Sequence, residues 1–177
     1  MAGITPVDDA KLSSGMKALV KRFRDDPNYA NGLGIFAHKP EIAEIIWSRY
    51  AELLDNGRLP RELKELVRVK LARNNDCSPY ASKSVAGHHQ PPGKLPREKI
   101  AAVDHYEISE VFTRREKLAL KFADKLGNDQ RALDEKFFDL LHQEFSEPEI
   151  VELAHVVAMG VGFERLIAVW APRVCAL

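Results

Sequence analysis

Cysteine is scarce in this sequence, and its scarcity limits the chemistry that the chain can carry. Only two of the 177 residues are cysteines, Cys77 and Cys175. Two cysteines do not make the disulfide framework of a small secreted domain, and they fit a reducing compartment. We therefore expect a cytoplasmic protein in which any thiol chemistry rests with these two residues.

Net charge and long apolar runs are also missing. The 26 basic residues equal the 26 acidic residues in number, so no global electric field attracts a polyanion. No stretch offers the ~20 apolar residues of a membrane span. The N-terminal sequence MAGITPVDDAK lacks the basic and apolar regions of a secretory signal. We expect neither nucleic acid nor a membrane as a partner.

The alternation of apolar and polar residues that is typical of β-strands is absent as well. Helical spacing and helix-capping residues occur instead. With 45% hydrophobic residues, the chain is long enough to form one domain with a proper core. We predict an all-α fold in a single domain over residues 1–177, with residues 1–15 loosely ordered.

Apolar residues at helical spacing and capping residues place most of the helices. Two capping boxes, Thr113–Glu116 and Ser146–Glu149, mark helix starts in the C-terminal half. Outside a central hairpin, the expected helices cover residues 13–23, 40–55, 97–106, 113–126, 137–145 and 146–170. The segment Asn28–His38 holds several glycines and turn formers and does not predict a helix.

The last of these helices is apolar nearly all round, which is typical of a helix buried between others. Gly160 and Gly162 would let a neighbouring backbone approach closely. His155 and Glu164 are polar residues in this apolar context. A hydrogen-bonded core pair or an interface contact is the simpler interpretation of both, and a place in a binding pocket is the alternative.

Residues 59–87 predict a helical hairpin, around which the rest of the chain is organised. Pro60 suits a first helical turn, and apolar residues recur on one face of residues 61–73 while the other face is charged. The Asn-Asn-Asp sequence at residues 74–76 then favours a turn, so a second helix should begin at residue 78 or 79.

The hairpin brings chemically useful residues together. Folding the second helix back on the first places Ser84 across from Glu65. Tyr80 lies one turn before Ser84 on the same face, and Cys77 lies at the turn. Glu65, Cys77, Tyr80 and Ser84 can therefore line one site.

The spacing of these residues resembles a known motif. In the carboxymuconolactone decarboxylase and alkylhydroperoxidase D-like superfamily, a glutamate is followed twelve residues later by a cysteine, then by a second cysteine and a histidine. Glu65 and Cys77 keep this spacing, whereas Tyr80 stands at the second cysteine and Ser84 at the histidine. The segments FTRREKLALKFADKL and FSEPEIVELAHVVA resemble the second half of the same superfamily. The resemblance covers residues 40–170, most of the chain.

The resemblance implies a fold and an activity. The fold is the alkylhydroperoxidase D-like helical bundle, with about seven or eight helices around the hairpin and a buried C-terminal helix. In redox members the glutamate and the histidine form a proton relay that activates the second cysteine, and the first cysteine closes a disulfide with it. For this chain, the implied activity is thiol-dependent hydroperoxide reduction, in which Cys77 attacks the peroxide, Glu65 supplies the proton path and an external thiol reductant resolves the sulfenic acid. No cofactor is implied.

The superfamily also implies a homo-oligomer, either a trimer or a hexamer. The apolar final helix, together with Trp47 and Trp170, agrees with this expectation, because it is more apolar surface than a small monomer easily hides.

The site residues also have simpler interpretations. A free cysteine is often a small buried hydrophobe, and a glutamate on a charged helix is often exposed. Tyr80 is either a phenol donor or a space filler, and Ser84 cannot act as a base near neutral pH. The missing second cysteine and histidine favour another function, either a non-redox decarboxylase-like enzyme acting on a small organic acid or a small-acid-binding oligomer without catalysis.

Adjacent histidines at positions 88 and 89 raise the question of a metal site. Neighbouring residues project to different sides of a helix, and no further cluster of cysteine and histidine occurs at ligand spacing. We therefore predict that the chain binds no metal at His88 and His89.

Overall fold

The computed structural model describes residues 3–22, 27–75 and 95–170, and gives the backbone alone for residues 27–31. Every regular element in these ranges is a helix, so the all-α prediction is confirmed. The α-helices are α1 (Ser14–Arg22), α2 (Pro27–Phe36), α3 (Pro40–Asp55), α4 (Arg61–Asn74), α6 (Arg97–Ala102), α7 (Arg114–Asn128), α8 (Glu135–His142) and α9 (Glu147–Trp170). Short 3-10 helices cover Asp9–Lys11 (η1), Val103–His105 (η2) and Gln130–Ala132 (η3). None of the described helices has the length and apolar character to cross a bilayer.

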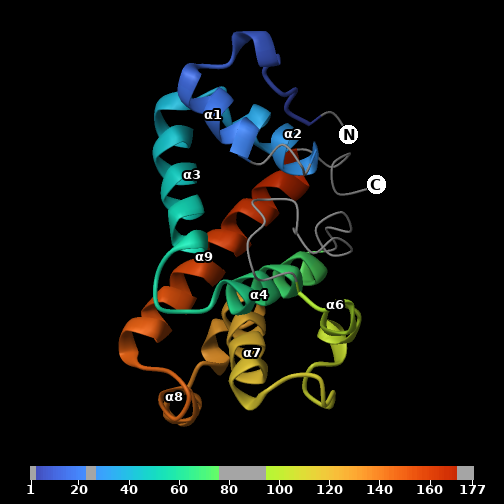
Figure 1. The fold of residues 1–177 in the computed structure, drawn as a ribbon, viewed down its shortest axis with the longest axis vertical. Helices are drawn as coiled ribbons and strands as arrows, with labels where there is room; N and C mark the ends of the chain where they lie inside the picture. Colours follow the sequence, from blue (N-terminus) through green and yellow to red (C-terminus); the bar gives the residue numbers. More distant parts are fainter. Residues whose placement is uncertain (1–2, 23–26, 76–94, 171–177) are drawn as a thin grey trace.

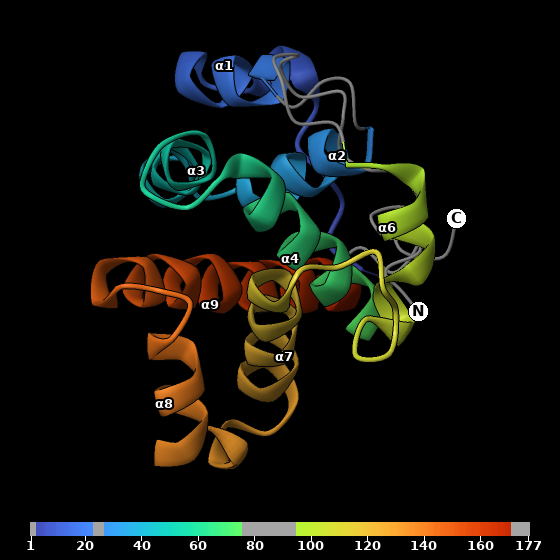
Figure 2. The ribbon, with the colours of Figure 1, turned by 60° about the horizontal axis from the view of Figure 1, so that its bottom comes forward.

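Helix α9 runs through the middle of the molecule. Figures 1 and 2 show α1, α2 and α3 on one side of α9, and α7 and α8 on the other. Helix α4 crosses α9 and packs against both α9 and α7. Helix α4 is the first helix of the predicted hairpin, so this half of the hairpin packs on the final helix. The second half of the hairpin lies outside the described residues.

Helix α2 contradicts the interpretation of Asn28–His38 as non-helical, because tertiary packing overrides the low helix propensity of glycine. Leu33 is fully buried and Ile35 is 3% exposed. Gly34 lies against the N-terminal segment, where a Cβ atom would come within 2.9 Å of the Cβ atom of Pro6. The amide of Val7 donates to the carbonyl of Gly34 at 3.0 Å. Contacts distant in the sequence therefore select the helix.

Side chains cap the starts of α1 and α7, and one half of the capping box predicted at Ser146–Glu149 is present before α9. The amide of Met16 donates to Ser13 Oγ at 3.1 Å, so Ser13 caps α1. At the start of α7, Glu116 N donates to Thr113 Oγ1 at 3.2 Å and Thr113 N donates to Glu116 Oε2 at 2.9 Å, which completes the capping box. Before α9, the amide of Ser146 donates to the carboxylate of Glu149 at 2.9 Å.

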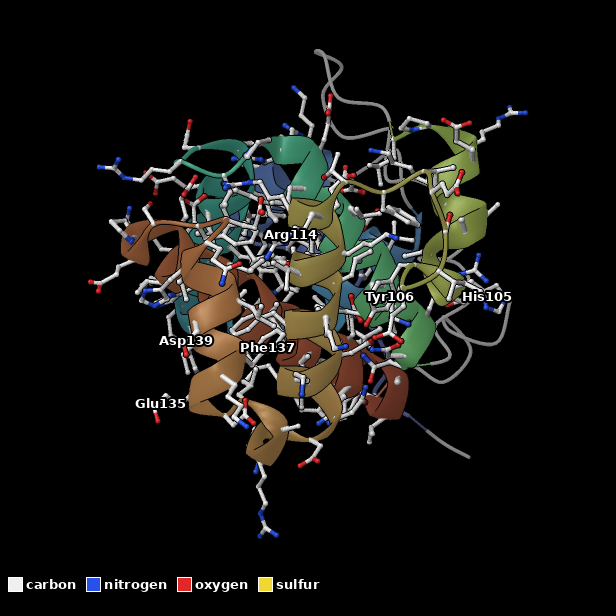
Figure 3. All side chains as sticks on the ribbon, turned by 90° about the horizontal axis from the view of Figure 1, so that it is seen from below. His105, Tyr106, Arg114, Glu135, Phe137 and Asp139 are labelled. Atoms are coloured by element: carbon white, nitrogen blue, oxygen red, sulfur yellow. The ribbon has the colours of Figure 1, made fainter. Side chains whose placement is uncertain are left out.

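Helix α8 shows how capping and amphipathic spacing orient a helix on the core. The amide of Phe137 donates to Asp134 Oδ1 at 2.9 Å at its first turn. Phe137 is 4% exposed and points toward α7, whereas Glu135 and Asp139 lie on the outer side of the helix (Figure 3). The apolar side of α8 therefore packs on the bundle while its acidic side faces solvent.

Helix α4 is buried nearly all round, including much of its charged face. Its charged residues Lys64, Arg68 and Lys70 are buried, and their carboxylate partners are Glu152, Glu65 and Asp124, respectively. Buried charges persist in proteins when they are paired and hydrogen-bonded. The pairing explains how a helix with so many charges can occupy the centre of the bundle.

Helix α9 is only partly as expected. It buries one side against its neighbours, but Val151 and Val169 are exposed, so the helix is not covered all round. A Cβ atom on Gly160 would lie 2.8 Å from Leu71 Cδ1, so a side chain of α4, and not the predicted neighbouring backbone, approaches closely at Gly160. Within the described residues, a Cβ atom on Gly162 would have nothing within 4 Å, so the expectation for Gly162 is wrong.

The two glycines form a matched pair for a stability test. Gly160→Ala should destabilise the protein by about 1–2 kcal/mol, because the new methyl group overlaps the fully buried Leu71. Gly162→Ala should be neutral or stabilise by about 0.5–1 kcal/mol, because alanine favours a helix and the space is open. Urea unfolding followed by circular dichroism measures both effects. Equal effects of the two changes would contradict the packing of α4 on α9.

Candidate functional site

The structure describes one of the four predicted site residues, Glu65 on α4. The other three, and the two histidines and second cysteine considered with them, lie outside the described residues: Cys77, Tyr80, Ser84, His88, His89 and Cys175. The described part of the candidate site is therefore α4 from Glu65 to its C-terminal end, which leads toward Cys77, and the part of α9 that packs on it.

Glu65 lies in the second turn of α4 and forms an ion pair with Arg68. Arg68 Nη1 lies 3.0 Å from Glu65 Oε2, and the side chains are 6% and 12% exposed, respectively. The simpler interpretation of Glu65 as an exposed surface residue is therefore wrong. A carboxylate held by a guanidinium group in a dry environment is an oriented hydrogen-bond acceptor.

Asn75 ends α4 and connects it to α9. Its side-chain amide donates to the carbonyl of Leu71 at 2.9 Å and to Glu164 Oε2 at 3.1 Å. The side-chain oxygen of Asn75, Oδ1, accepts a hydrogen bond from Arg165 Nε at 3.4 Å. These hydrogen bonds supply a donor to a carbonyl group in the last turn of α4. They also fix the position of Asn75, from which the chain continues to Cys77.

Glu164 is the buried acid of this site. Its exposure is 6%, and burial raises the pKa of its carboxyl group to about 8, against the opposing effects of the hydrogen bond from Asn75 and the charge of Arg68. Glu164 therefore holds a proton near neutral pH, while Arg68 forms its direct ion pair with Glu65. The protonated carboxyl group of Glu164 on α9 and the paired carboxylate of Glu65 on α4 thus both interact with Arg68. This arrangement is suited to proton transfer.

The chain itself links this pair to the predicted thiol. Cys77 follows Asn75 by two residues in the sequence. Glu164 is hydrogen-bonded to the side chain of Asn75. A carboxyl group that carries a proton at neutral pH is thus tied to the residue that leads into Cys77.

His155 does not join Glu164, so the expectation of a hydrogen-bonded core pair is wrong. His155 is exposed, and its Nδ1 atom lies 2.8 Å from the carbonyl oxygen of Val151 in its own helix. Sequence reasoning missed Arg68 and Asn75 as members of the site. The position of Arg68 three residues after Glu65 was the available signal, because residues at this spacing are neighbours on a helix.

Glu164→Gln should remove a pH dependence of stability. The pKa of an unfolded glutamate is about 4.3, whereas burial raises that of Glu164 to about 8 in the folded protein. Between these values the folded state keeps a proton that the unfolded state has lost, so stability falls as pH rises through this window and then levels off. Glutamine does not ionise, so the variant should gain about 3–4 kcal/mol relative to the parent between pH 5 and pH 8.

Urea unfolding at a series of pH values measures this slope. Glu147→Gln is the matched control, because Glu147 is an exposed carboxyl group at the start of the same helix. The control should keep the slope of the parent. A Glu164→Gln variant with an unchanged slope would show that Glu164 is ionised in the folded protein.

Solved structures share this fold. The apo structure of the debrominase Bmp8 matches with a TM-score of 0.77 and 20% identity, over 93% of this chain and 88% of that chain. A cysteine-to-alanine variant of Bmp8 in complex with 2,3,4-tribromopyrrole matches with a TM-score of 0.73 and 22% identity, over 98% and 95%. The alkylhydroperoxidase AhpD core of an uncharacterized peroxidase-related protein from Ralstonia eutropha JMP134 matches with a TM-score of 0.70 and 18% identity, over 94% and 89%. No protein-family model and no curated protein matches the sequence.

Proposed function

The chain has the alkylhydroperoxidase D-like fold, and we propose that it is a thiol-dependent oxidoreductase that reduces a hydroperoxide through Cys77. The Cys77 thiolate attacks the terminal peroxide oxygen, the O–O bond breaks, and the alcohol leaves with a proton supplied by the site. Cys77 becomes a sulfenic acid. Two molecules of an external thiol then return it to the thiol and release one water and one disulfide.

The observation that carries this proposal is the buried carboxyl group of Glu164 beside Asn75. The superfamily motif uses a histidine as its proton carrier, and this sequence has Ser84 in that place. A carboxyl group that titrates at about pH 8 can give and take a proton near neutrality, which serine cannot do. In this mechanism Glu164 transfers the proton. Glu65 and Arg68 set the electrostatic environment of the site.

Reductive debromination is a second candidate, favoured by the two Bmp8 structures, which match nearly the whole chain. Bmp8 is a debrominase, and a variant without one of its cysteines was solved with a tribromopyrrole. In this candidate, Cys77 takes the bromine of an electron-rich aromatic ring as the ring carbon gains a proton. Two external thiols then become a disulfide and release bromide and a proton, which balances the reaction.

We also propose that the chain forms a homo-oligomer. Trp47 is 1% exposed and so supplies none of the apolar surface expected of it. Other large apolar side chains are exposed instead, including Ile45 at 66% and Val151 at 56%. Exposed apolar residues in such numbers support an interface between copies.

One assay separates the two candidates. The purified protein is given cumene hydroperoxide or tribromopyrrole with dithiothreitol, and thiol oxidation, alcohol and bromide are measured. Peroxide consumption that requires Cys77 supports the first candidate, and bromide release that requires Cys77 supports the second. If neither substrate is consumed, the non-redox or ligand-binding alternative takes the place of both.

A further inference from the structure

A cavity lies between α2, α3 and the end of α9, where the mechanism proposed above uses no residue. Its volume is about 420 Å³, within the range of small-molecule sites. Its wall is almost wholly apolar and is formed by side chains such as Ile35, Phe36, Ile46, Trp47, Phe163 and Leu166. The segment before α1 adds Ile4, whose amide donates to the carbonyl of Trp170 at 2.9 Å and so fixes one side of the cavity.

Aromatic rings form a rigid wall of this cavity. The rings of Trp47 and Phe163 stack with their centroids 4.5 Å apart. Phe36 meets Trp47 edge to face at 5.4 Å and Trp170 at 5.5 Å. Interlocked rings of this kind keep their positions, so the cavity is a preformed surface rather than a gap that closes by side-chain motion.

The ionisable residues that line the cavity are basic. Among the described lining residues these are His38 and Lys39, and none of the described lining residues is acidic. The Nε2 atom of His38 lies 2.9 Å from the carbonyl oxygen of Thr5, which fixes the imidazole ring. Lys39 pairs with the exposed Glu41 at 3.0 Å, and its side chain is 74% exposed. A weak surface ion pair of this type exchanges readily for another anion.

We propose that this cavity binds an alkyl carboxylate of the fatty-acid type. Its hydrocarbon chain lies along the aromatic and aliphatic wall, and its carboxylate lies beside Lys39. A ligand with an apolar body and a single anionic head complements an apolar wall whose described ionisable residues are basic. The proposed mechanism assigns no role to the lining residues named here, so the proposal stands or falls separately from the proposed function.

The chain carries its own reporter for this site. It has two tryptophans, Trp47 and Trp170, and both line the cavity. Titration with dodecanoate, below the concentration at which it forms micelles, should change the tryptophan fluorescence and reach saturation at one equivalent per chain. The Cys77→Ser variant should give the same titration.

Two variants with matched controls test where the ligand lies. Lys39→Gln should weaken dodecanoate binding about two- to fivefold and leave the neutral probe dodecanol unaffected. Lys136→Gln, which changes an exposed lysine of α8, should change neither. Ile42→Glu places an acid on the cavity wall and should weaken dodecanoate binding more than about fivefold. Ile108→Glu is its control, because Ile108 is 84% exposed and lies outside the cavity.

Three outcomes would overturn the proposal. Fluorescence that does not change with dodecanoate shows that the cavity takes no such ligand. A response that appears only as micelles form, or that both lysine variants weaken alike, shows adventitious detergent-like binding. If Ile42→Glu dissociates an oligomer in light scattering while dodecanoate leaves the parent fluorescence unchanged, a second copy of this chain covers the cavity.

Discussion

Lys64→Met is expected to destabilise the folded protein by about 3–5 kcal/mol, the largest stability effect that the structure predicts. Lys64 is 1% exposed, and its Nζ atom lies 2.5 Å from Glu152 Oε1. The same ammonium group donates to the carbonyl oxygens of Leu53, at 2.7 Å, and Asn56. Methionine fills a similar volume but removes the ammonium group that pairs with the carboxylate of Glu152 and donates to two carbonyl groups.

The position of these partners explains why the effect should be large. Glu152 also accepts hydrogen bonds from the amides of Arg58, at 2.7 Å, and Leu59, at 3.4 Å. The connection between α3 and α4 is therefore tied to α9 through Glu152 and Lys64. The loss of the lysine should therefore weaken the packing of α3, α4 and α9 together, and its effect should exceed that of removing a single contact.

Arg49→Met provides the matched control. Arg49 pairs with Glu52 at 2.7 Å, but the two side chains are 75% and 56% exposed. Removal of such a surface pair should change stability by less than about 0.5 kcal/mol. Urea unfolding of both variants measures the difference. A loss of similar size in both would show that Lys64 is not paired in a dry environment.

The effect of Lys64→Met should also depend on pH. Burial alone would raise the pKa of Glu152, but Lys64 and the amides of Arg58 and Leu59 outweigh it, so the pKa lies below its usual value. A lowered pKa gives stability that is present above the unfolded value of about 4.3 and is lost as pH falls through the folded value. The difference between the parent and Lys64→Met should therefore shrink below pH 4.

The sequence predicted the helical class and most helix positions because local signals determine them. Capping residues such as Ser13 and Thr113 act within a few residues of themselves, so they can be read without a structure. Helix α2 could not be predicted in this way, because Gly34 is helical through contacts with residues far away in the sequence. The burial of α4 was missed for the same reason, since the partners that neutralise Lys64 and Lys70 lie on α9 and α7.

The candidate site was predictable only where spacing carries the information. Glu65 was found from its distance to Cys77 in the sequence. Glu164 was noted as a polar residue in an apolar helix, but its link to Asn75 joins residues 89 positions apart, which no local pattern reveals. Its raised pKa depends on burial, which only the packing of α9 on α4 shows.

Cys77→Ser is expected to abolish thiol-dependent peroxide consumption, with a loss of about 10²-fold or more. Serine keeps the shape of the side chain but is a far weaker nucleophile, because its hydroxyl group does not ionise near neutral pH. Without added thiol, the parent should consume one equivalent of peroxide and stop as a sulfenic acid, because Tyr80 stands where the superfamily motif has its second cysteine. Cys175→Ser is the matched control and should turn over like the parent.

A gain of function tests the same mechanism from the opposite side. Tyr80→Cys combined with Ser84→His restores the superfamily motif, so an internal disulfide should form under peroxide and the rate should rise. If Glu164 carries the proton in the parent, Glu164→Gln should slow the parent and have less effect on the restored variant, because the new histidine supplies another proton carrier. Equal slowing in both backgrounds would assign Glu164 a structural role. Unchanged peroxide consumption by Cys77→Ser would remove the thiol mechanism, and the buried carboxyl group would then belong to a non-redox site.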